Sequence, residues 1–185
     1  MIAGEAGGLR LVAPKGQRTR PTADRVKEAL FSALGDRVVD ATVLDLFAGS
    51  GALAIEALSR GARQAILVDR DPQALDAIRR NLRTTRLGDR ARVLRRGVIT
   101  FLRTAGAFAR GPFDIVLVDP PYDLAVSELA TILELLAGGW LREGATVVLE
   151  RAATSDPPPL PAGWGVTWER TYGGTLVQLT GPVSG

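Results

Sequence analysis

The chain contains neither cysteine nor histidine among its 185 residues. This absence excludes disulfides, zinc sites built from thiolates or imidazoles, cysteine nucleophiles and Ser-His-Asp triads. No apolar run approaches the roughly 18 to 20 residues that span a membrane, and residues 1–5 lack the charged and then apolar pattern of a secretory signal. We therefore expect a cytoplasmic protein with no membrane segment and no bound metal.

The composition is typical of one globular domain. Hydrophobic residues make up 46% of the chain, enough to fill a single core at this length, so we expect one domain over residues 1–185, acting as a monomer. A net charge of +3 and a sequence pI near 9.9 fit a polyanionic partner. All basic residues except Lys15 and Lys27 are arginine, which indicates either phosphate and base recognition or a coding preference.

The order of apolar patterns predicts an α/β fold. Residues 1–21 are rich in glycine and basic residues and form an N-terminal arm, in which 9–12 could pair as a short strand; residues 22–185 form a helix capped by Thr22 and an α/β core. Alternation of strands and helices implies a parallel sheet, followed by an antiparallel pair at 166–169 and 175–179. The expected parallel strands lie near 43–47, 65–69, 91–95, 113–118 and 145–150, and the helices near 51–60, 72–86, 98–105 and 125–137.

A glycine-rich turn follows the first of these strands. Residues 49–54, Gly-Ser-Gly-Ala-Leu-Ala, match G-x-G-x-x-A, so a nicotinamide or flavin dinucleotide is one candidate ligand. Asp45, inside the preceding strand, would repel a pyrophosphate but attract the positive charges of S-adenosylmethionine. Asp45 could instead stabilise the turn. Asp69 ends the next strand and can accept ribose hydroxyls of either cofactor, whereas Asp71 is expected to cap the helix that starts at Pro72.

The segment Asp119-Pro120-Pro121-Tyr122 follows the strand near 113–118. Asp119 and the carbonyl of Pro120 can accept the two N–H groups of an exocyclic amine and aim its lone pair at a methyl donor. The prolines hold that carbonyl in place, and Tyr122 offers a face on which a flipped base can stack. A turn leaving a strand, with a buried tyrosine, is the alternative interpretation. Transfer to nitrogen needs no cysteine nucleophile, unlike methylation of a pyrimidine ring carbon.

These segments together resemble the bacterial small-subunit (16S) ribosomal RNA guanine-N2-methyltransferases of the RsmD type. The likeness covers most of the chain and is carried by 20–22, 24–26, 28–31, 43–53, 56–62 and 119–122. It implies the Rossmann-like seven-stranded sheet of class I S-adenosylmethionine-dependent methyltransferases, mostly parallel with a C-terminal antiparallel hairpin and helices on both faces. It also implies methylation of one guanine of 16S rRNA, in the small subunit or an assembly intermediate.

The resemblance assigns roles by position. It implies catalytic roles for Asp119, Pro120 and Tyr122, and contacts to substrate RNA by Arg18, Arg20, Arg25, Pro121 and Tyr122. For the cofactor it implies Asp45, Phe47, Gly49, Ser50, Gly51, Asp69, Arg70, Gly97 and Val98. Two departures stand out: Glu5-Ala6-Gly7-Gly8 replaces a more basic arm, and Arg96-Gly97-Val98 stands where relatives often have an acidic residue for the adenine amine.

Three other functions stay open on sequence alone. They are adenine-N6 methylation of DNA or RNA, a nicotinamide-dependent oxidoreductase, and a non-catalytic RNA-binding module. Asp119, where many adenine-directed relatives have asparagine, favours guanine. Arg79, Arg83 and Arg86 form a helical stripe, which we interpret as a solvated face.

Overall fold

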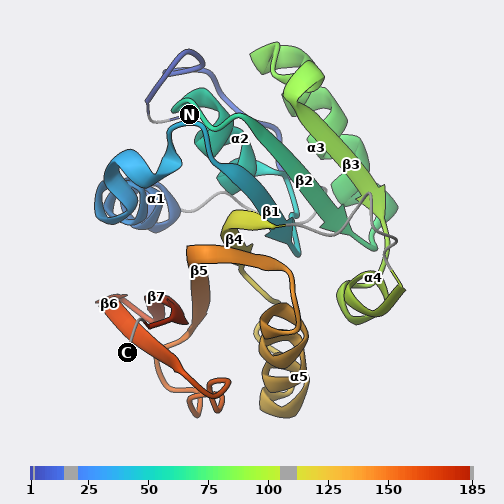
Figure 1. The fold of residues 1–185 in the computed structure, drawn as a ribbon. Helices are drawn as coiled ribbons and strands as arrows, with labels where there is room; N and C mark the ends of the chain where they lie inside the picture. The colour runs from blue at the N-terminus through green and yellow to red at the C-terminus, as the bar shows by residue number, and fades with distance from the viewer. Residues whose placement is uncertain (2, 15–20, 105–111, 184–185) are drawn as a thin grey trace.

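The computed structural model describes residues 1, 3–14, 21–104 and 112–183, with the backbone alone at 21–23. All seven strands of the described chain join one sheet, in the order β3-β2-β1-β4-β5-β7-β6 (Figure 1). Strands β1 to β5 run parallel, and β7 pairs antiparallel with both β5 and β6. The strands are β1 (Thr42–Leu46), β2 (Gln64–Asp69), β3 (Ala91–Arg95), β4 (Phe113–Val118), β5 (Leu141–Ala152), β6 (Trp164–Tyr172) and β7 (Thr175–Pro182). The predicted fold class is therefore confirmed.

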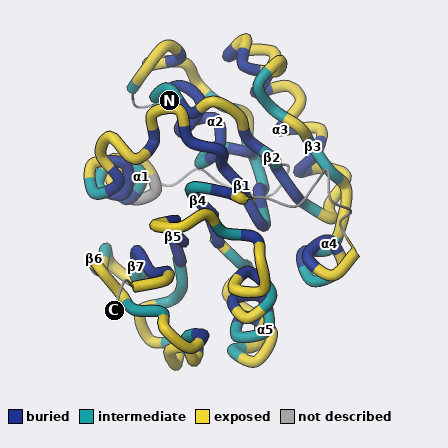
Figure 2. The backbone as a smooth tube through the Cα atoms, viewed as in Figure 1, coloured by how far each residue is buried: buried dark blue, intermediate teal, exposed yellow. Residues whose placement is uncertain are grey.

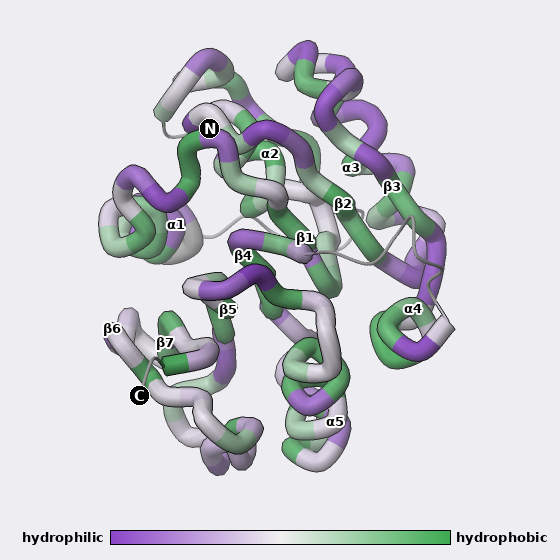
Figure 3. The backbone as a smooth tube through the Cα atoms, viewed as in Figure 1, coloured by the Kyte–Doolittle hydropathy of each residue, from purple (hydrophilic) through white to green (hydrophobic). Residues whose placement is uncertain are grey.

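Helices cover both faces of the sheet and enclose two apolar cores. One core packs helices α1 to α3 against one face of the central strands, and the other packs α4 and α5 against the opposite face. The central strands are buried and apolar while the outer sides of the helices are exposed (Figures 2 and 3). The helices are α1 (Pro21–Leu34), α2 (Ala52–Ser59), α3 (Pro72–Thr85), α4 (Val98–Thr104) and α5 (Val126–Ala137), with 3-10 turns η1 (Gly35–Val38) and η2 (Gly88–Arg90).

The described part of the N-terminal arm is docked on the core, and the short strand expected at 9–12 does not form. The amide side chain of Asn81 takes the place of a neighbouring strand: it accepts from the backbone N–H of Val12 at 2.7 Å and donates to the Val12 carbonyl at 2.9 Å. The same Asn81 amide donates to the carbonyl of Ser50 at 2.8 Å. One buried side chain thus ties the arm to the glycine-rich turn.

The start of the arm is held by the end of α2. Ser59 accepts from the Glu5 N–H through its carbonyl and from the Ala6 N–H through its hydroxyl, both at 2.9 Å. Its hydroxyl also donates to the Ala3 carbonyl at 2.6 Å. The non-basic stretch around Glu5 is therefore docked on the folded domain, with Ala6 buried in the core.

Several boundaries differ modestly from expectation. Helix α1 begins at Pro21, one residue before the expected cap, and β5 runs well beyond the apolar stretch 145–150 in both directions. The extra residues of β5, apart from Leu141, are polar or small, but the second half of the strand pairs with β7 as far as Ala152. Pairing with a neighbouring strand, which single-sequence periodicity does not report, sets the end of the strand.

Candidate functional site

The site lies where the order of the parallel strands reverses. Going outward from the centre, β1 is followed by β2 and β3 on one side, and β4 by β5 on the other. Loops that leave the carboxyl ends of β1 and β4 at such a switch point diverge to opposite faces and leave room for a ligand. The glycine-rich turn leaves β1 and Asp119 leaves β4, so the two motifs found in the sequence meet at this edge.

The glycine-rich turn has a backbone that few other residues can adopt. Gly49 and Gly51 have φ of 56° and 75°, in the left-handed region that glycine enters without a steric cost. A Cβ at Gly51 would lie 3.0 Å from Leu67 Cδ2 and 3.2 Å from Ile78 Cγ1. Phe47 is also left-handed, with φ of 64°, which is rare for a bulky residue and is concentrated at functional sites. The backbone that leads into α2 is therefore held close to Leu67 of β2.

Asp45 is buried beneath this turn, with 1% of its surface exposed. Its carboxylate accepts from the N–H of Ala54 at 3.2 Å, which is the turn-stabilising contact considered from the sequence. Burial is the main cause that raises the pKa of Asp45 well above its usual value, and the nearby charges of Asp119 and Asp69 raise it further. The arrangement places three carboxyl groups within electrostatic reach of one another.

Asp69 joins the end of β2 to the glycine-rich turn. One of its carboxylate oxygens accepts from Gly49 N–H at 2.8 Å and the other from Asp71 N–H at 2.9 Å. Its carbonyl accepts from Arg96 N–H at 3.0 Å, which brings the start of α4 beside it. Three of the cofactor residues inferred by resemblance thus lie close to Asp69 along the chain or through this bond: the exposed Arg70, Gly97 just before α4, and Val98, the first residue of α4.

Asp71 caps α3 as expected. Its side chain accepts from the Gln73 N–H at 2.9 Å, and Pro72 occupies the first helical position. The structural interpretation of this carboxylate is therefore confirmed, and Asp71 is separate from the chemistry of the site.

Asp119 stands at the mouth of the site. Burial by the surrounding strand ends raises the pKa of Asp119 to about 6, although the residue as a whole is exposed. Tyr122 is 66% exposed, which differs from the alternative of a buried tyrosine. Its hydroxyl lies 3.3 Å from Thr175 Oγ1, at the start of β7, so the β6–β7 hairpin holds the aromatic ring.

Glu150 is the residue that the motif search missed. It follows the apolar run 145–149 of β5 in the same way that Asp119 follows β4. Burial, and then the charge of Asp119, raise the pKa of Glu150 to about 8. The available signal was its position, because this carboxylate ends the apolar run of its strand, as Asp69 ends β2 and Asp119 directly follows β4.

The RNA residues expected on the N-terminal side are only partly placed. Arg18 and Arg20 lie outside the described residues, and Arg25 is exposed on the first turns of α1. Helix α1 contacts β6, so it flanks the hairpin that holds Tyr122. The assignment of these arginines to RNA stays a prediction.

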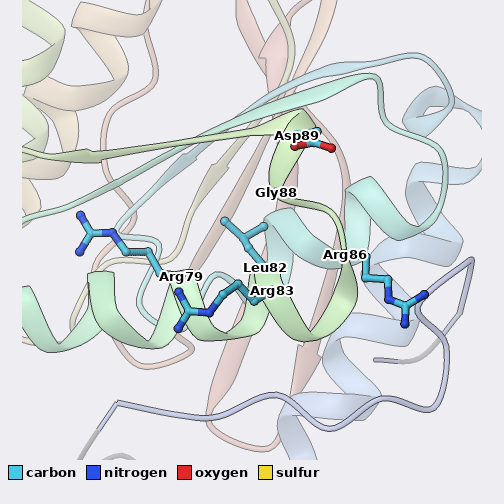
Figure 4. A pocket seen from close by; sticks show the side chains of 6 residues that line it. All are labelled: Arg79, Leu82, Arg83, Arg86, Gly88 and Asp89. Carbon is cyan, nitrogen blue, oxygen red and sulfur yellow. The ribbon is translucent and has the colours of Figure 1, made fainter.

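The arginine stripe of α3 lines a shallow depression with η2, away from the carboxyl edge. Figure 4 shows the guanidinium groups of Arg79, Arg83 and Arg86 spread along the helix rather than converging on one point, with Leu82 between them. All three arginines are exposed. This geometry agrees with the interpretation of the stripe as a solvated helix face.

The described residues contain neither a membrane-spanning helix nor a cluster of metal-binding side chains. No helix among them has the length and apolar character needed to cross a membrane. No group of three or more acidic side chains in those same segments is arranged to hold a metal ion.

Comparison with known proteins identifies the family. The family model described as "Conserved hypothetical protein 95" matches residues 1–181. The chain is 38% identical to "Ribosomal RNA small subunit methyltransferase D" of Escherichia coli, over 97% of this chain and 87% of that protein. It is 37% identical to "Putative rRNA methyltransferase YlbH" of Bacillus subtilis, over 97% of this chain and 96% of that protein.

Solved structures similar to this chain are also described as methyltransferases. The "Putative methyltransferase yhhF from Escherichia coli" superposes with a TM-score of 0.84 at 38% identity, covering 97% of this chain and 95% of the other. SMU.776, a putative methyltransferase complexed with SAH, has a TM-score of 0.69 at 14% identity over 88% of this chain and 50% of the other, which indicates a shared fold. The chain therefore belongs to the Conserved hypothetical protein 95 family, a family of methyltransferases that includes ribosomal RNA small subunit methyltransferase D.

Proposed function

We propose that this protein transfers the methyl group of S-adenosylmethionine to the exocyclic N2 amine of one guanine in small-subunit ribosomal RNA. One observation carries the proposal: Asp119 ends β4 at the strand-order switch point, opposite the glycine-rich turn that ends β1. A methyl donor bound by the turn and an amine held by Asp119 would meet there. The relatives named as methyltransferases of small-subunit rRNA support the same substrate.

The carboxyl groups of the site suit a positively charged cofactor. S-adenosylmethionine supplies an activated methyl group on a positively charged sulfonium. The charges of Asp119 and Asp69 raise the cost of ionising Asp45, and a positive charge nearby would relieve that cost, whereas a pyrophosphate would add to it. Asp69 keeps free lone pairs for ribose hydroxyls, since each of its oxygens accepts one N–H. Gly97 and Val98 lie at the position expected to border the adenine.

The protein's own residues would orient the amine. The lone pair of the guanine N2 amine is delocalised into the ring, so it attacks only when it is localised and aimed. Asp119 would accept one N2–H and the Pro120 carbonyl the other, which favours a pyramidal nitrogen facing the methyl group. A charge-assisted hydrogen bond of this kind contributes roughly 1.5 to 3 kcal/mol, and orientation contributes much of the remainder. The methylated nitrogen is acidic and loses its proton to Asp119 or to water.

Tyr122 would hold the flipped base. Its ring is exposed and its hydroxyl is positioned by Thr175, which leaves a face free for stacking worth about 1 to 3 kcal/mol. Arg25 on α1, together with Arg18, Arg20 and Pro121, is expected to contact the RNA around that base. The net charge of +3 favours such contacts.

The test uses purified protein, radiolabelled S-adenosylmethionine and small ribosomal subunits from cells that lack the endogenous enzyme. We expect N2-methylguanosine at one position after digestion of the RNA. Asp119→Ala should lower kcat/KM at least 100-fold with cofactor affinity retained. The matched control is Asp156→Ala, because Asp156 is an exposed carboxylate with no described role, on the loop after β5.

Two outcomes would contradict the proposal. Labelled N6-methyladenosine would assign the protein to the adenine-directed alternative. Tight cofactor binding without transfer to any subunit preparation would refute the substrate and leave the fold and family unaffected.

A further inference from the structure

The register of the sheet places Glu150 beside Asp119. Val118 of β4 pairs with Leu149 of β5, so the next residue of each strand continues the same ladder at the carboxyl edge. Neighbouring strands lie about 4.8 Å apart, and residues two apart on a strand share a face. Leu117 and Val148 both belong to the core under α1 to α3. Asp119 and Glu150 are therefore directed to that face, where Asp45 also lies.

Glu150 has no partner that would explain its position structurally. It is half-buried, and no hydrogen bond or ion pair joins its carboxyl group to another residue in the described chain. Burial and the charge of Asp119 raise the pKa of Glu150. A strained carboxyl pair of this kind destabilises the free protein, and such pairs are concentrated at functional sites.

Two arginines near Glu150 in the sheet, one on β5 itself and one on β6, interact with other groups. Arg151 donates to the Ser155 carbonyl at 2.6 Å. Arg170, across β7 from Glu150, has its guanidinium 5.8 Å from the centre of the Tyr172 ring. The hydroxyl of Tyr172 is itself buried without a hydrogen-bond partner among the described groups. Among the described residues Glu150 thus has no cationic partner, and it borders the hairpin that positions Tyr122.

We propose that Glu150 is the second carboxyl group of the target-base site and accepts the N1–H of guanine while Asp119 accepts the adjacent N2 amine. This inference rests on the proposed guanine-N2 function. Guanine presents N1–H and N2–H side by side, so two neighbouring acceptors match its edge. Adenine presents an acceptor, N1, beside its amine, and Glu150 in its ionised form would face that nitrogen unpaired. Glu150 would therefore determine the choice of guanine.

The analogue 2-aminopurine isolates this contact. It carries the same C2 amine as guanine, but its N1 is an acceptor without hydrogen. Small subunits are reconstituted with 16S rRNA that has either guanine or 2-aminopurine at the methylated position. The kcat/KM of methyl transfer is then measured for the wild-type protein and for Glu150→Ala. The loss of the guanine O6 affects both proteins alike, so the comparison of ratios cancels it.

We expect Glu150→Ala to lower kcat/KM on guanine roughly 10- to 100-fold, the range of one charge-assisted hydrogen bond. On 2-aminopurine the variant should be at least as active as the wild-type protein, because the carboxylate that would face the N1 acceptor unpaired is gone. Glu143→Ala is the matched control, because Glu143 is an exposed carboxylate on the same strand at the opposite end. Glu150→Gln, which keeps an accepting carbonyl, should recover part of the guanine activity.

The outcomes separate the inference from the function on which it rests. Equal losses on guanine and 2-aminopurine would show that Glu150 acts on folding or on the cofactor, and would overturn the inference while N2-methylguanosine still forms. If Glu150→Ala fails to fold, the test uses the wild-type protein alone. Equal wild-type kcat/KM values on guanine and 2-aminopurine would then overturn the inference about Glu150. Methyl transfer to a base other than guanine would refute the proposed function itself.

Discussion

Replacing Glu150 with glutamine should stabilise the folded protein at alkaline pH. The pKa of Glu150 is raised from 4.5 to about 8 by burial and by Asp119. The folded state therefore retains a proton that the unfolded state has lost. The free energy of unfolding falls as the pH rises from about 4.5 to about 8, and the cost of the ionised carboxylate is fully present above that range. Glutamine has the same shape and no charge, so it avoids this cost.

The size of the effect follows from the shift. A rise from 4.5 to about 8 corresponds to about 5 kcal/mol as an upper limit. Solvent at the half-buried carboxyl reduces this value, and the cost is shared with Asp119, so we expect Glu150→Gln to raise the free energy of unfolding by about 1 to 2 kcal/mol at pH 9. Near pH 4 the variant and the wild-type protein should be equal.

Urea denaturation followed by tryptophan fluorescence at pH 4, 7 and 9 measures the effect, because the chain contains three tryptophans. Glu143→Gln, on the exposed part of β5, should show no such dependence on pH. A Glu150→Gln protein that is less stable than the wild type at pH 9 would refute the reasoning, since it would mean that the ionised Glu150 has a favourable partner. A gain that is the same at every pH would refute the electrostatic explanation.

Two further predictions concern the cofactor side of the site. Gly51→Ala should lower the free energy of unfolding by about 1 to 3 kcal/mol in urea titrations, because the residue has φ of 75° and its Cβ would press on Leu67 at 3.0 Å; a stability equal to that of the wild type would contradict the left-handed turn. Asp69→Ala should weaken S-adenosylmethionine binding roughly 10- to 100-fold in calorimetry, because the charged hydrogen bonds to the ribose and the hydrogen bond from Gly49 N–H are lost. The control is Asp76→Ala, on the exposed side of α3. An unchanged affinity of the Asp69→Ala protein would remove Asp69 from the cofactor site.

Local chemistry explains why much of this protein was predictable. The left-handed glycines of the turn, the cap at Asp71 and the position of Asp119 after a buried strand each depend on residues within a few positions of one another. The alternation of strands and helices restricts the parallel part of the sheet to few topologies. Those features were stated from the sequence, and the structure has them.

The errors and omissions involve contacts between distant segments. The stretch 9–12 was expected to pair as a strand, but Asn81, 69 residues away from Val12, satisfies its backbone instead. Tyr122 is held by Thr175, 53 residues later. Periodicity and motifs report neighbours along the chain, and neither of these contacts leaves such a pattern.

The sequence by itself determined the family-level chemistry: the absence of cysteine excludes a thiolate nucleophile, and the glycine-rich turn with the Asp-Pro-Pro-Tyr segment predicts methyl transfer to an amine. Only the tertiary structure decided which carboxyl groups act on one another. Asp119 and Glu150 are far apart in the chain and become neighbours through the register of β4 and β5. Their pKa values are raised because folding removes water from both and, at Glu150, adds the repulsion of Asp119, and neither effect exists before the strands pair.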